Sequence, residues 1–244
     1  MTKLFCIIIF LVGVTSHATE SAVTVKGIEG LSIEKINDTY LTELATKPGL
    51  LIIDTATALT YQGSKIQIHD LKSSRIVGKR AFKTPESCQH FVTIQEPGRA
   101  LRGLYCFRGK GKRDSLQLYL GKGKFSTLLK TPNPITAVTG GLHRLFFLSG
   151  DAIYLLREGE KIKPVFVSSF LTGIKSMAFD TESDLLFLAT QNEVYSLRAG
   201  TLDLLVQGLG GSLAWINSDL YIYNSAGVYR LPSPSKYLVV KKEP

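Results

Sequence analysis

The sequence contains little cysteine and none of the short motifs by which catalytic centres are usually recognised. Its three cysteines are not closely spaced, and its four histidines never form the HExxH arrangement of a zinc site. The lysine-rich turns "GKGKRD" and "GKGKF" lack the Gly-Lys-Ser/Thr order of a phosphate-binding loop. We therefore assign no catalytic residue, no metal ligand and no cofactor from the sequence.

Three weaker patterns could carry chemistry, and each also has an ordinary structural explanation. His69, His90 and His143 lie far apart in the sequence and could converge on a channel, or could be unrelated strand and turn residues. Ser212 in "GGSLA" lacks the final glycine of a nucleophile elbow, and its surroundings predict strand rather than the strand-turn-helix that an elbow needs. "SPSK" at residues 233–236 matches Ser-x-x-Lys, but its prolines predict a turn before a last strand.

Long apolar runs are absent apart from one near the start of the chain. Residues 1–18, "MTKLFCIIIFLVGVTSHA", combine Lys3 with an apolar run at residues 4–14 and small residues at Ser16 and Ala18. This is the pattern of a secretory signal peptide, and the run is shorter than the roughly 20 residues that a membrane-spanning helix needs. We predict that residues 19–244 are exported as a single domain, periplasmic or extracellular, with no transmembrane segment after processing.

Acidic residues are fewer than basic ones, and the formal net charge is +9. Such a balance favours anionic partners such as lipid headgroups, glycans or nucleic acid, although nothing predicts sequence-specific nucleic-acid binding. Six basic residues form the densest cluster of charge. They are Arg108, Lys110, Lys112, Arg113, Lys122 and Lys124. They predict either a docking patch for an anionic partner or the solvated tips of two hairpins.

Two cysteines survive removal of the signal peptide, and an oxidising compartment favours their pairing. Cys88 and Cys106 flank the turn "EPG", and a hairpin that pairs Gln95 with Arg99 would place them directly opposite each other. Cross-strand neighbours lie about 4.5–5.5 Å apart at Cβ, close to disulfide distance. We predict a disulfide between them; the alternative is a pair of buried reduced thiols.

From Leu50 onward the sequence predicts short strands separated by turn residues. Blocks that begin at Leu50, Gln89, Ile135, Ile174 and Gly211 are spaced by 39, 46, 39 and 37 residues. Recurrence at this period, with four strands in each unit, is typical of a β-propeller. The expected fold is therefore all-β, a propeller of five or six four-stranded blades.

The third, fourth and fifth blocks show the repeat most clearly. "ITAVT", "RLFFLS", "AIYLLR" and "IKPVFV" form the third block, with a two-residue "GD" turn in its middle. Aromatic residues recur at matching places in the second and third strands, which favours packing between similar neighbouring sheets. They are Phe147, Phe187 and Tyr221, then Tyr154, Tyr195 and Tyr229.

Residues 19–49 allow three interpretations. "SAVTVKG" predicts a strand that could pair with the last blade and close the ring. "LSIEKINDTYLTELATKPG" has apolar residues at helical spacing, ended by Lys47-Pro48-Gly49, while Thr39, Tyr40 and Thr42 favour strand. We slightly favour a degenerate sixth blade over a closing strand or a short helix.

The phrase "SMAFDTESDLLFLATQNEVYSL" resembles a blade of the NHL and gluconolactonase-like six-bladed propellers. The resemblance covers mainly residues 135–232 and implies a propeller fold. It also implies, for the gluconolactonase-like group, a metal held by one Glu, one Asn and one or two Asp at the central channel. Asp180 lies at the end of a first strand, but Gly140 or Gly141 and Asn217 stand at the corresponding places and no glutamate matches.

These observations favour a binding function over a catalytic one. We expect an exported, non-catalytic binding or scaffold propeller that presents its loops and channel mouth to a protein or anionic ligand. The alternative is a lactonase-like hydrolase that acts at the central channel with a divalent metal.

Overall fold

The computed structural model describes residues 23–25, 28–47, 49–62, 65–81, 90–96, 99–107, 114–121, 124–141, 144–157 and 159–238. Side chains are described for these residues except 80–81, 90–96, 99–107 and 121. The predicted signal peptide therefore lies outside the described residues. In the part of the chain that is described, no helix has the length and apolar character needed to cross a membrane.

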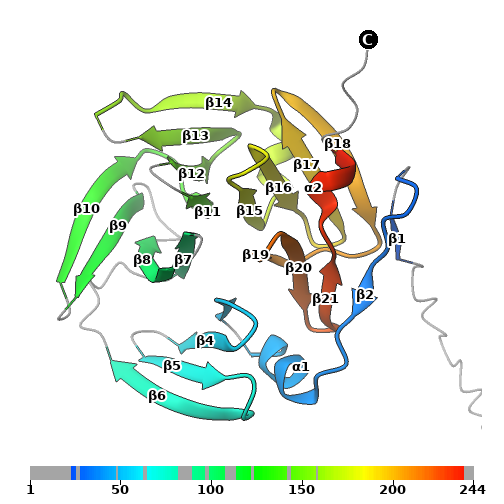
Figure 1. The fold of residues 1–244 in the computed structure, drawn as a ribbon. Coiled ribbons are helices and arrows are strands. Elements are labelled where there is room, and N and C mark those ends of the chain that lie inside the picture. Colours follow the sequence, from blue (N-terminus) through cyan, green and yellow to red (C-terminus); the bar gives the residue numbers. More distant parts are fainter. Residues whose placement is uncertain are drawn as a thin grey trace, which may run out of the picture.

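The described residues form five antiparallel sheets arranged in a propeller-like ring (Figure 1). We number the sheets 1 to 5 in chain order, and in each the first strand lies innermost. Sheet 1 comprises β3 (Leu50–Ile52), β4 (Thr57–Gln62), β5 (Lys65–Asp70) and β6 (Arg75–Ala81). Sheet 2 comprises β7 (His90–Glu96), β8 (Arg99–Phe107), β9 (Asp114–Gly121) and β10 (Lys124–Thr131). The predicted all-β propeller class is confirmed.

The sheets in the second half of the chain follow the predicted strands closely. Sheet 3 comprises β11 (Ile135–Gly141), β12 (Arg144–Ser149), β13 (Ala152–Arg157) and β14 (Lys163–Val167). After the 3₁₀ helix η1 (Ser169–Gly173), sheet 4 comprises β15 (Ser176–Asp180), β16 (Leu185–Ala189), β17 (Glu193–Arg198) and β18 (Thr201–Gln207). Sheet 5 contains β19 (Ser212–Ile216), β20 (Asp219–Asn224) and β21 (Gly227–Leu231).

The recurring aromatic residues lie in the predicted second and third strands, but their pairing is not uniform. Tyr154 lies opposite Phe147 and stacks on it, with ring centroids 5.1 Å apart. Tyr195 instead lies opposite Leu188. The alignment therefore assigns residues to the right strands, while the cross-strand register shifts by one residue between sheets.

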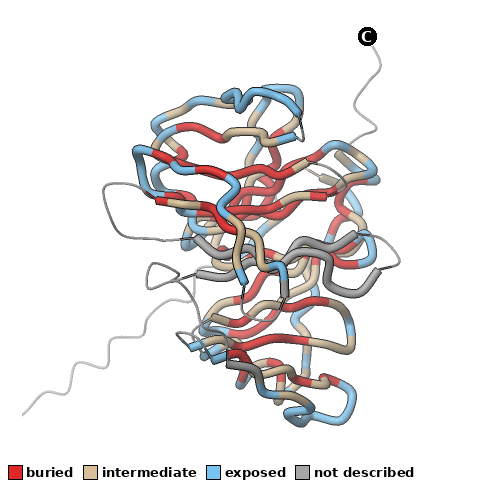
Figure 2. Tube along the Cα trace, turned by 90° about the vertical axis from the view of Figure 1, so that its left-hand side faces the viewer, coloured by how far each residue is buried: buried red, intermediate tan, exposed pale blue. Residues whose placement is uncertain are grey.

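Each boundary between neighbouring sheets holds its own cluster of apolar side chains. Sheets 4 and 5 share the cluster around Phe187, whose ring stacks on Trp215 at 5.3 Å. Sheets 3 and 4 share another, in which Phe146 and Phe179 lie 4.7 Å apart. Three further clusters join sheets 2 and 3, sheets 1 and 2, and sheets 5 and 1. Buried residues accordingly run through the interior of the sheets, while turn tips are exposed (Figure 2).

The N-terminal segment does not form a sixth blade within the described residues, which corrects our preference from the sequence. β1 (Thr24–Val25) pairs with β18 at the edge of sheet 4, not with the last sheet. β2 (Glu34–Lys35) pairs with β21 and supplies the fourth strand of sheet 5. A strand at the edge of a sheet exposes unpaired backbone N–H and C=O groups. β1 covers this edge in sheet 4, and β2 covers it in sheet 5.

The helix interpretation holds for residues 39–45, whereas the strand that completes the last sheet is β2 and not the predicted "SAVTVKG" segment. α1 (Thr39–Ala45) begins after Asp38, whose backbone is extended. The Asp38 carboxylate accepts a hydrogen bond from the Leu41 N–H at 2.9 Å and so caps the start of the helix. Leu41 and Leu44 are buried in the cluster that joins sheets 5 and 1. The helix therefore packs at that boundary and brings the chain to β3.

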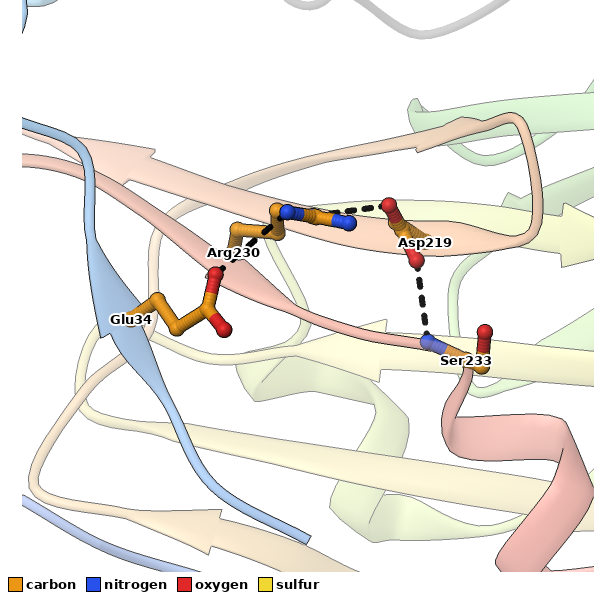
Figure 3. Close-up of polar contacts among 4 residues, drawn as sticks. All are labelled: Glu34, Asp219, Arg230 and Ser233. Atoms are coloured by element: carbon orange, nitrogen blue, oxygen red, sulfur yellow. Dashed lines mark hydrogen bonds and ion pairs between the residues drawn. The ribbon is translucent and has the colours of Figure 1, made fainter.

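An ion-pair network anchors β2 to sheet 5 (Figure 3). The Arg230 Nε donates to Asp219 at 2.7 Å, and its second guanidinium nitrogen lies 3.4 Å from Glu34. Asp219 also accepts the Ser233 N–H at 3.0 Å, just before the last helix. One carboxylate thus joins the end of sheet 5 to the start of the C-terminal helix.

The C-terminal segment differs from the predicted last strand. Residues 234–238 form α2 (Pro234–Leu238), with a proline at the first helical position. A backbone N–H at this position has no partner within the helix, so proline costs no hydrogen bond there. The outer place in sheet 5 is occupied by β2, so the chain after β21 has no edge there with which to pair. The "SPSK" sequence therefore begins a short helix.

Candidate functional site

A cavity of about 540 Å³ lies where the innermost strands begin. Its walls come from the starts of β3, β11, β15 and β19, together with the α1–β3 connection and parts of β4, η1 and β20. The first residues of four innermost strands therefore meet there, from segments far apart in the sequence. The cavity thus lies at the end of the ring where these innermost strands start; we call this end the channel mouth and take the cavity as the candidate site.

Two lysines are the charged residues among those that line the cavity. Lys47 follows α1, and its backbone N–H donates to the Leu44 carbonyl at 3.0 Å. Its ammonium group forms an ion pair with Glu43 at 2.9 Å, in which the two side chains are 45% and 62% exposed. An exposed pair of this kind contributes between 0 and about 1 kcal/mol, so Lys47 can exchange Glu43 for another anion.

Lys175 occupies the position directly before β15. Its backbone N–H donates to the Ala189 carbonyl at 2.7 Å, which fixes the main chain at the cavity wall. Buried Ile174 precedes it, while Lys175 itself is exposed. Within the described residues the Lys175 ammonium has no ion-pair partner.

The neutral polar side chains of the lining are largely engaged within the protein. The Ser176 hydroxyl accepts the Leu213 N–H at 2.9 Å and so joins β15 to β19. The Tyr223 hydroxyl donates to the Leu50 carbonyl at 3.2 Å. Burial raises the pKa of Tyr223 well above its ordinary value, so the phenol stays protonated and a hydrogen-bond donor.

Asn224 is committed in the same way, because its amide donates to the Gly210 carbonyl and its carbonyl accepts the Ala226 N–H, both at 2.8 Å. Thr172 donates its hydroxyl to the Ser169 carbonyl at 2.9 Å. Thr136 is exposed on β11. Thr136 and the two lysines therefore offer the clearest polar contacts for a ligand.

Apolar side chains form the rest of the wall. Leu50, Ile135, Met177 and Leu213 are each less than 9% exposed and belong to four different innermost strands. The main chain at Ile135 is held by Asp114, whose carboxylate accepts the Ile135 N–H at 2.7 Å across the boundary between sheets 2 and 3. The cavity thus combines a buried apolar wall with two lysines.

Gly49 permits the tight approach of the chain to this wall. Its φ is +75°, a conformation that glycine adopts without steric cost. A Cβ at this position would lie 2.5 Å from the Tyr61 carbonyl oxygen. The α1–β3 connection, which carries Lys47, therefore depends on glycine.

The donor chemistry of this site does not fit a divalent metal ion. Its lining, among the described residues, contains no Asp, Glu, His or Cys, and the described part of the chain holds no group of three such residues suited to a metal. Hard cations bind oxygen-rich, anionic ligands, whereas two ammonium groups would repel them. The described lining therefore supplies no ligand set for such an ion.

The acidic position suggested by the family resemblance serves a structural role. Asp180 ends β15, at the opposite end of that strand from the cavity. It is 3% exposed, and its carboxylate accepts the Ser235 hydroxyl at 2.5 Å and the Glu182 N–H at 3.0 Å. Asn217 lies in the turn between β19 and β20 with a φ of +51°. The structure does not bring Asp180 to the channel mouth.

Of the three histidines considered from the sequence, His69 can be placed in full. It is 1% exposed in sheet 1, with Nδ1 2.7 Å from the Tyr40 hydroxyl and Nε2 2.7 Å from the Thr60 hydroxyl. Burial lowers the pKa of His69, with a smaller effect from the Lys47 charge. The side chain of His90 and all of His143 lie outside the described residues. His69 is therefore a satisfied core residue rather than a channel ligand.

Ser212 begins β19 and lines the cavity, but it is not a nucleophile elbow, because a strand and not a helix follows it. Gly210, two residues earlier, packs closely: a Cβ there would lie 2.4 Å from the Thr190 carbonyl oxygen. Gly210 thus allows the β18–β19 connection to pack closely against the chain that follows β16 of sheet 4.

Most of the predicted basic cluster lies outside the described residues. The five members concerned are Arg108, Lys110, Lys112, Arg113 and Lys122. Lys124 is exposed at the start of β10. The docking patch therefore stays a prediction.

The predicted hairpin around the "EPG" turn is present, but its register differs. Glu96 lies opposite Arg99, in place of Gln95, and Phe91 lies opposite Cys106. An irregularity between Ile94 and Glu96 shifts the pairing along the strands. Cys88 is outside the described residues, so the disulfide stays a prediction, while the register that motivated it is wrong.

The sequence did not identify Lys47, Lys175 or Thr136 as possible ligand contacts; Lys47 was noted only as part of the helix-ending Lys47-Pro48-Gly49. The signal that could have found them is positional, because each lies at or just before the start of an innermost strand. Once a propeller is expected, these starts are the places where separate repeats meet.

No family model matches this sequence, and no curated protein matches it. Solved structures do. A gluconolactonase from Xanthomonas campestris is 10% identical with a TM-score of 0.50, over 72% of this chain and 67% of that chain. A streptogramin B lyase structure is 14% identical with a TM-score of 0.48, over 84% and 74%.

A protein of unknown function from Bacteroides thetaiotaomicron is 8% identical with a TM-score of 0.47, over 86% of this chain and 75% of that chain. Identities this low concern the fold alone. The likeness to the gluconolactonase supports the propeller-like arrangement of the sheets.

Proposed function

We propose that this chain is an exported, non-catalytic binding protein that receives its ligand at the channel mouth. The observation that carries the proposal is the composition of the cavity: an apolar wall with two lysines and, among the described residues, no carboxylate or imidazole. Small-molecule sites are concave, mostly apolar and furnished with a few polar groups. Hydrolytic sites need a nucleophile, base or metal, and the described lining supplies none of these in a working arrangement.

The alternative is a metal-dependent hydrolase, and it is favoured by one observation, the shared fold with a gluconolactonase. Propellers carry many unrelated functions, so the fold alone does not decide between the two. The two proposals differ in their response to divalent ions and to a lactone.

Thermal unfolding of purified residues 19–244 with Ca²⁺ or Zn²⁺, together with a hydrolysis assay on D-glucono-1,5-lactone, separates the two functions. We expect an unchanged unfolding midpoint with either ion and lactone loss at the rate of the buffer alone. A rise in midpoint with a metal, accompanied by lactone turnover, would establish the hydrolase instead, because an ion that binds only the folded state stabilises it by mass action.

The same assay tests the binding half of the proposal with a panel of neutral, anionic and cationic small molecules. A ligand at about one hundred times its Kd stabilises the folded state by about 2.7 kcal/mol, a rise of roughly 5–10 °C for a protein of this size. Thr136→Trp, which fills the cavity, should remove the rise. Thr201→Trp, at an exposed position on β18, is the control and should retain it.

A further inference from the structure

The electrostatics of the cavity favour one sign of ligand charge. Lys47 and Lys175 are its charged lining residues, and among the described residues only Glu43 pairs with either of them. The Glu43 side chain is 62% exposed, so solvent screens that pair strongly. Because only this exposed pair holds the Lys47 ammonium, it can leave Glu43 for an anionic group that enters the cavity, where Lys175 is the second cation of the lining.

The rest of the lining restricts the body of that ligand. Ser176 and Tyr223 are held in hydrogen bonds to the main chain of neighbouring strands, and Asn224 uses both ends of its amide. A sugar acid or sugar phosphate would bring many hydroxyl groups to a wall with few open partners. Leu50, Met177 and Leu213 instead offer buried apolar surface.

The kind of cation also matters. An ammonium group on a flexible stem acts as a point charge, whereas recognition of phosphate commonly uses the planar fork of arginine or the N–H groups at a helix N-terminus. The described lining has neither an arginine nor such a helix start. Two lysines can each contact one oxygen of a single carboxylate.

We propose that the cavity binds an organic carboxylate carried on an apolar body, with Lys47 and Lys175 holding the carboxylate and the apolar wall covering the body. This rests on the binding function proposed above and names the class of ligand. The cavity of about 540 Å³ lies within the range of roughly 300–1,000 Å³ found for sites that enclose such molecules.

Binding of 2-naphthoate tests the proposal, with 2-naphthamide, 2-naphthylmethylamine and gluconate as probes of charge and of apolar body. Titration is followed by calorimetry at two salt concentrations. We expect 2-naphthoate to bind at least tenfold more tightly than the other three and to weaken as salt rises. Lys47→Gln and Lys175→Gln should each weaken binding about tenfold, since each removes a charge-assisted contact. Lys163→Gln, on the exposed strand β14, should leave it unchanged.

Glu43→Gln distinguishes a Lys47 that contacts the ligand from a Lys47 that only supports the fold. Removing the competing carboxylate should tighten 2-naphthoate binding, opposite in sign to Lys47→Gln. Equal binding of naphthoate and naphthamide, both lost in Thr136→Trp, would overturn the carboxylate class and leave the binding function standing. Naphthoate binding that survives Thr136→Trp or the two lysine substitutions would overturn the proposed site. If no member of the broader panel binds, the proposed function itself fails.

Discussion

At the scale of single residues, His69 illustrates how a candidate ligand becomes a structural residue. Its ring lies between the hydroxyls of Tyr40 in α1 and Thr60 in β4. A neutral imidazole donates from one nitrogen and accepts at the other, and each hydroxyl can play either role. The lowered pKa of His69 follows from this burial and from nearby Lys47, so the folded protein favours the neutral ring.

This arrangement predicts a dependence of stability on pH. In the unfolded chain His69 takes up a proton as the pH falls below about 6.5, whereas the folded protein takes it up only at lower pH. The unfolded state then binds more protons, so the free energy of unfolding falls as the pH falls from about 6.5 towards 5, by at most about 1.4 kcal/mol per pH unit. Urea unfolding across this range should show the loss.

The matched variant is His69→Gln, which keeps hydrogen-bonding groups and does not titrate. Its stability should vary less with pH across the same window. An identical slope in both proteins would mean that other groups cause the loss.

At the scale of elements, the N-terminal segment completes sheets that the rest of the chain leaves open. β1 covers the edge of sheet 4, β2 covers the edge of sheet 5, and α1 packs at the boundary between sheets 5 and 1. Asp219 joins Arg230 of β21 to the Ser233 N–H before α2, and Arg230 extends this network to Glu34 of β2 (Figure 3). The hydrogen bond to Asp219 raises the pKa of Arg230, as expected for a charge-assisted contact.

Two substitutions in this network should differ clearly in cost. Asp219→Ala removes the acceptor of both Arg230 and the Ser233 N–H from a side chain that is 11% exposed. We expect a loss of about 2–3 kcal/mol. Glu34→Ala removes a 3.4 Å contact from a side chain that is 51% exposed, and should cost less than about 1 kcal/mol.

Urea unfolding of both variants measures these costs. Equal losses, or the larger loss for Glu34→Ala, would show that β2 depends on the exposed ion pair and that the Asp219 contacts add little.

At the scale of the whole molecule, stability is distributed around the ring. The five apolar clusters each join two neighbouring sheets, so within the described residues no sheet buries its faces alone. Repeats that stack in this way depend on their neighbours. Damage at one boundary should therefore reduce the stability of the entire ring.

Leu44→Ala tests this coupling. Leu44 is fully buried in the cluster between sheets 5 and 1, so its truncation should cost about 3 kcal/mol. The single tryptophan, Trp215, packs in a different cluster, between sheets 4 and 5. We expect its fluorescence and the far-UV circular dichroism to report one shared transition, shifted by the same amount.

The comparison with wild-type protein uses the same two probes. A dichroism transition that moves to lower urea while the Trp215 transition stays in place would show that the boundaries unfold independently.

The sequence by itself determined the repeat. Short apolar strands of five to seven residues, recurring in blocks 37 to 46 residues apart, predict sheets that need similar neighbours, because a single block of that size cannot cover its own apolar faces. In the last three blocks most strand positions follow from this local pattern. The two-residue turn at Gly150 and Asp151 was also predictable, because its position between two apolar runs leaves little choice of connection.

Only the tertiary structure decided which residues meet at the channel mouth. Lys47 and Lys175 lie 128 positions apart, and neither belongs to a local motif, so nothing in the chain near one of them refers to the other. Nor does local pattern reveal that β2 completes the last sheet, because two residues carry too little periodicity to specify a partner nearly 200 positions away. Closing the ring brings these segments together, and the site exists because of that closure.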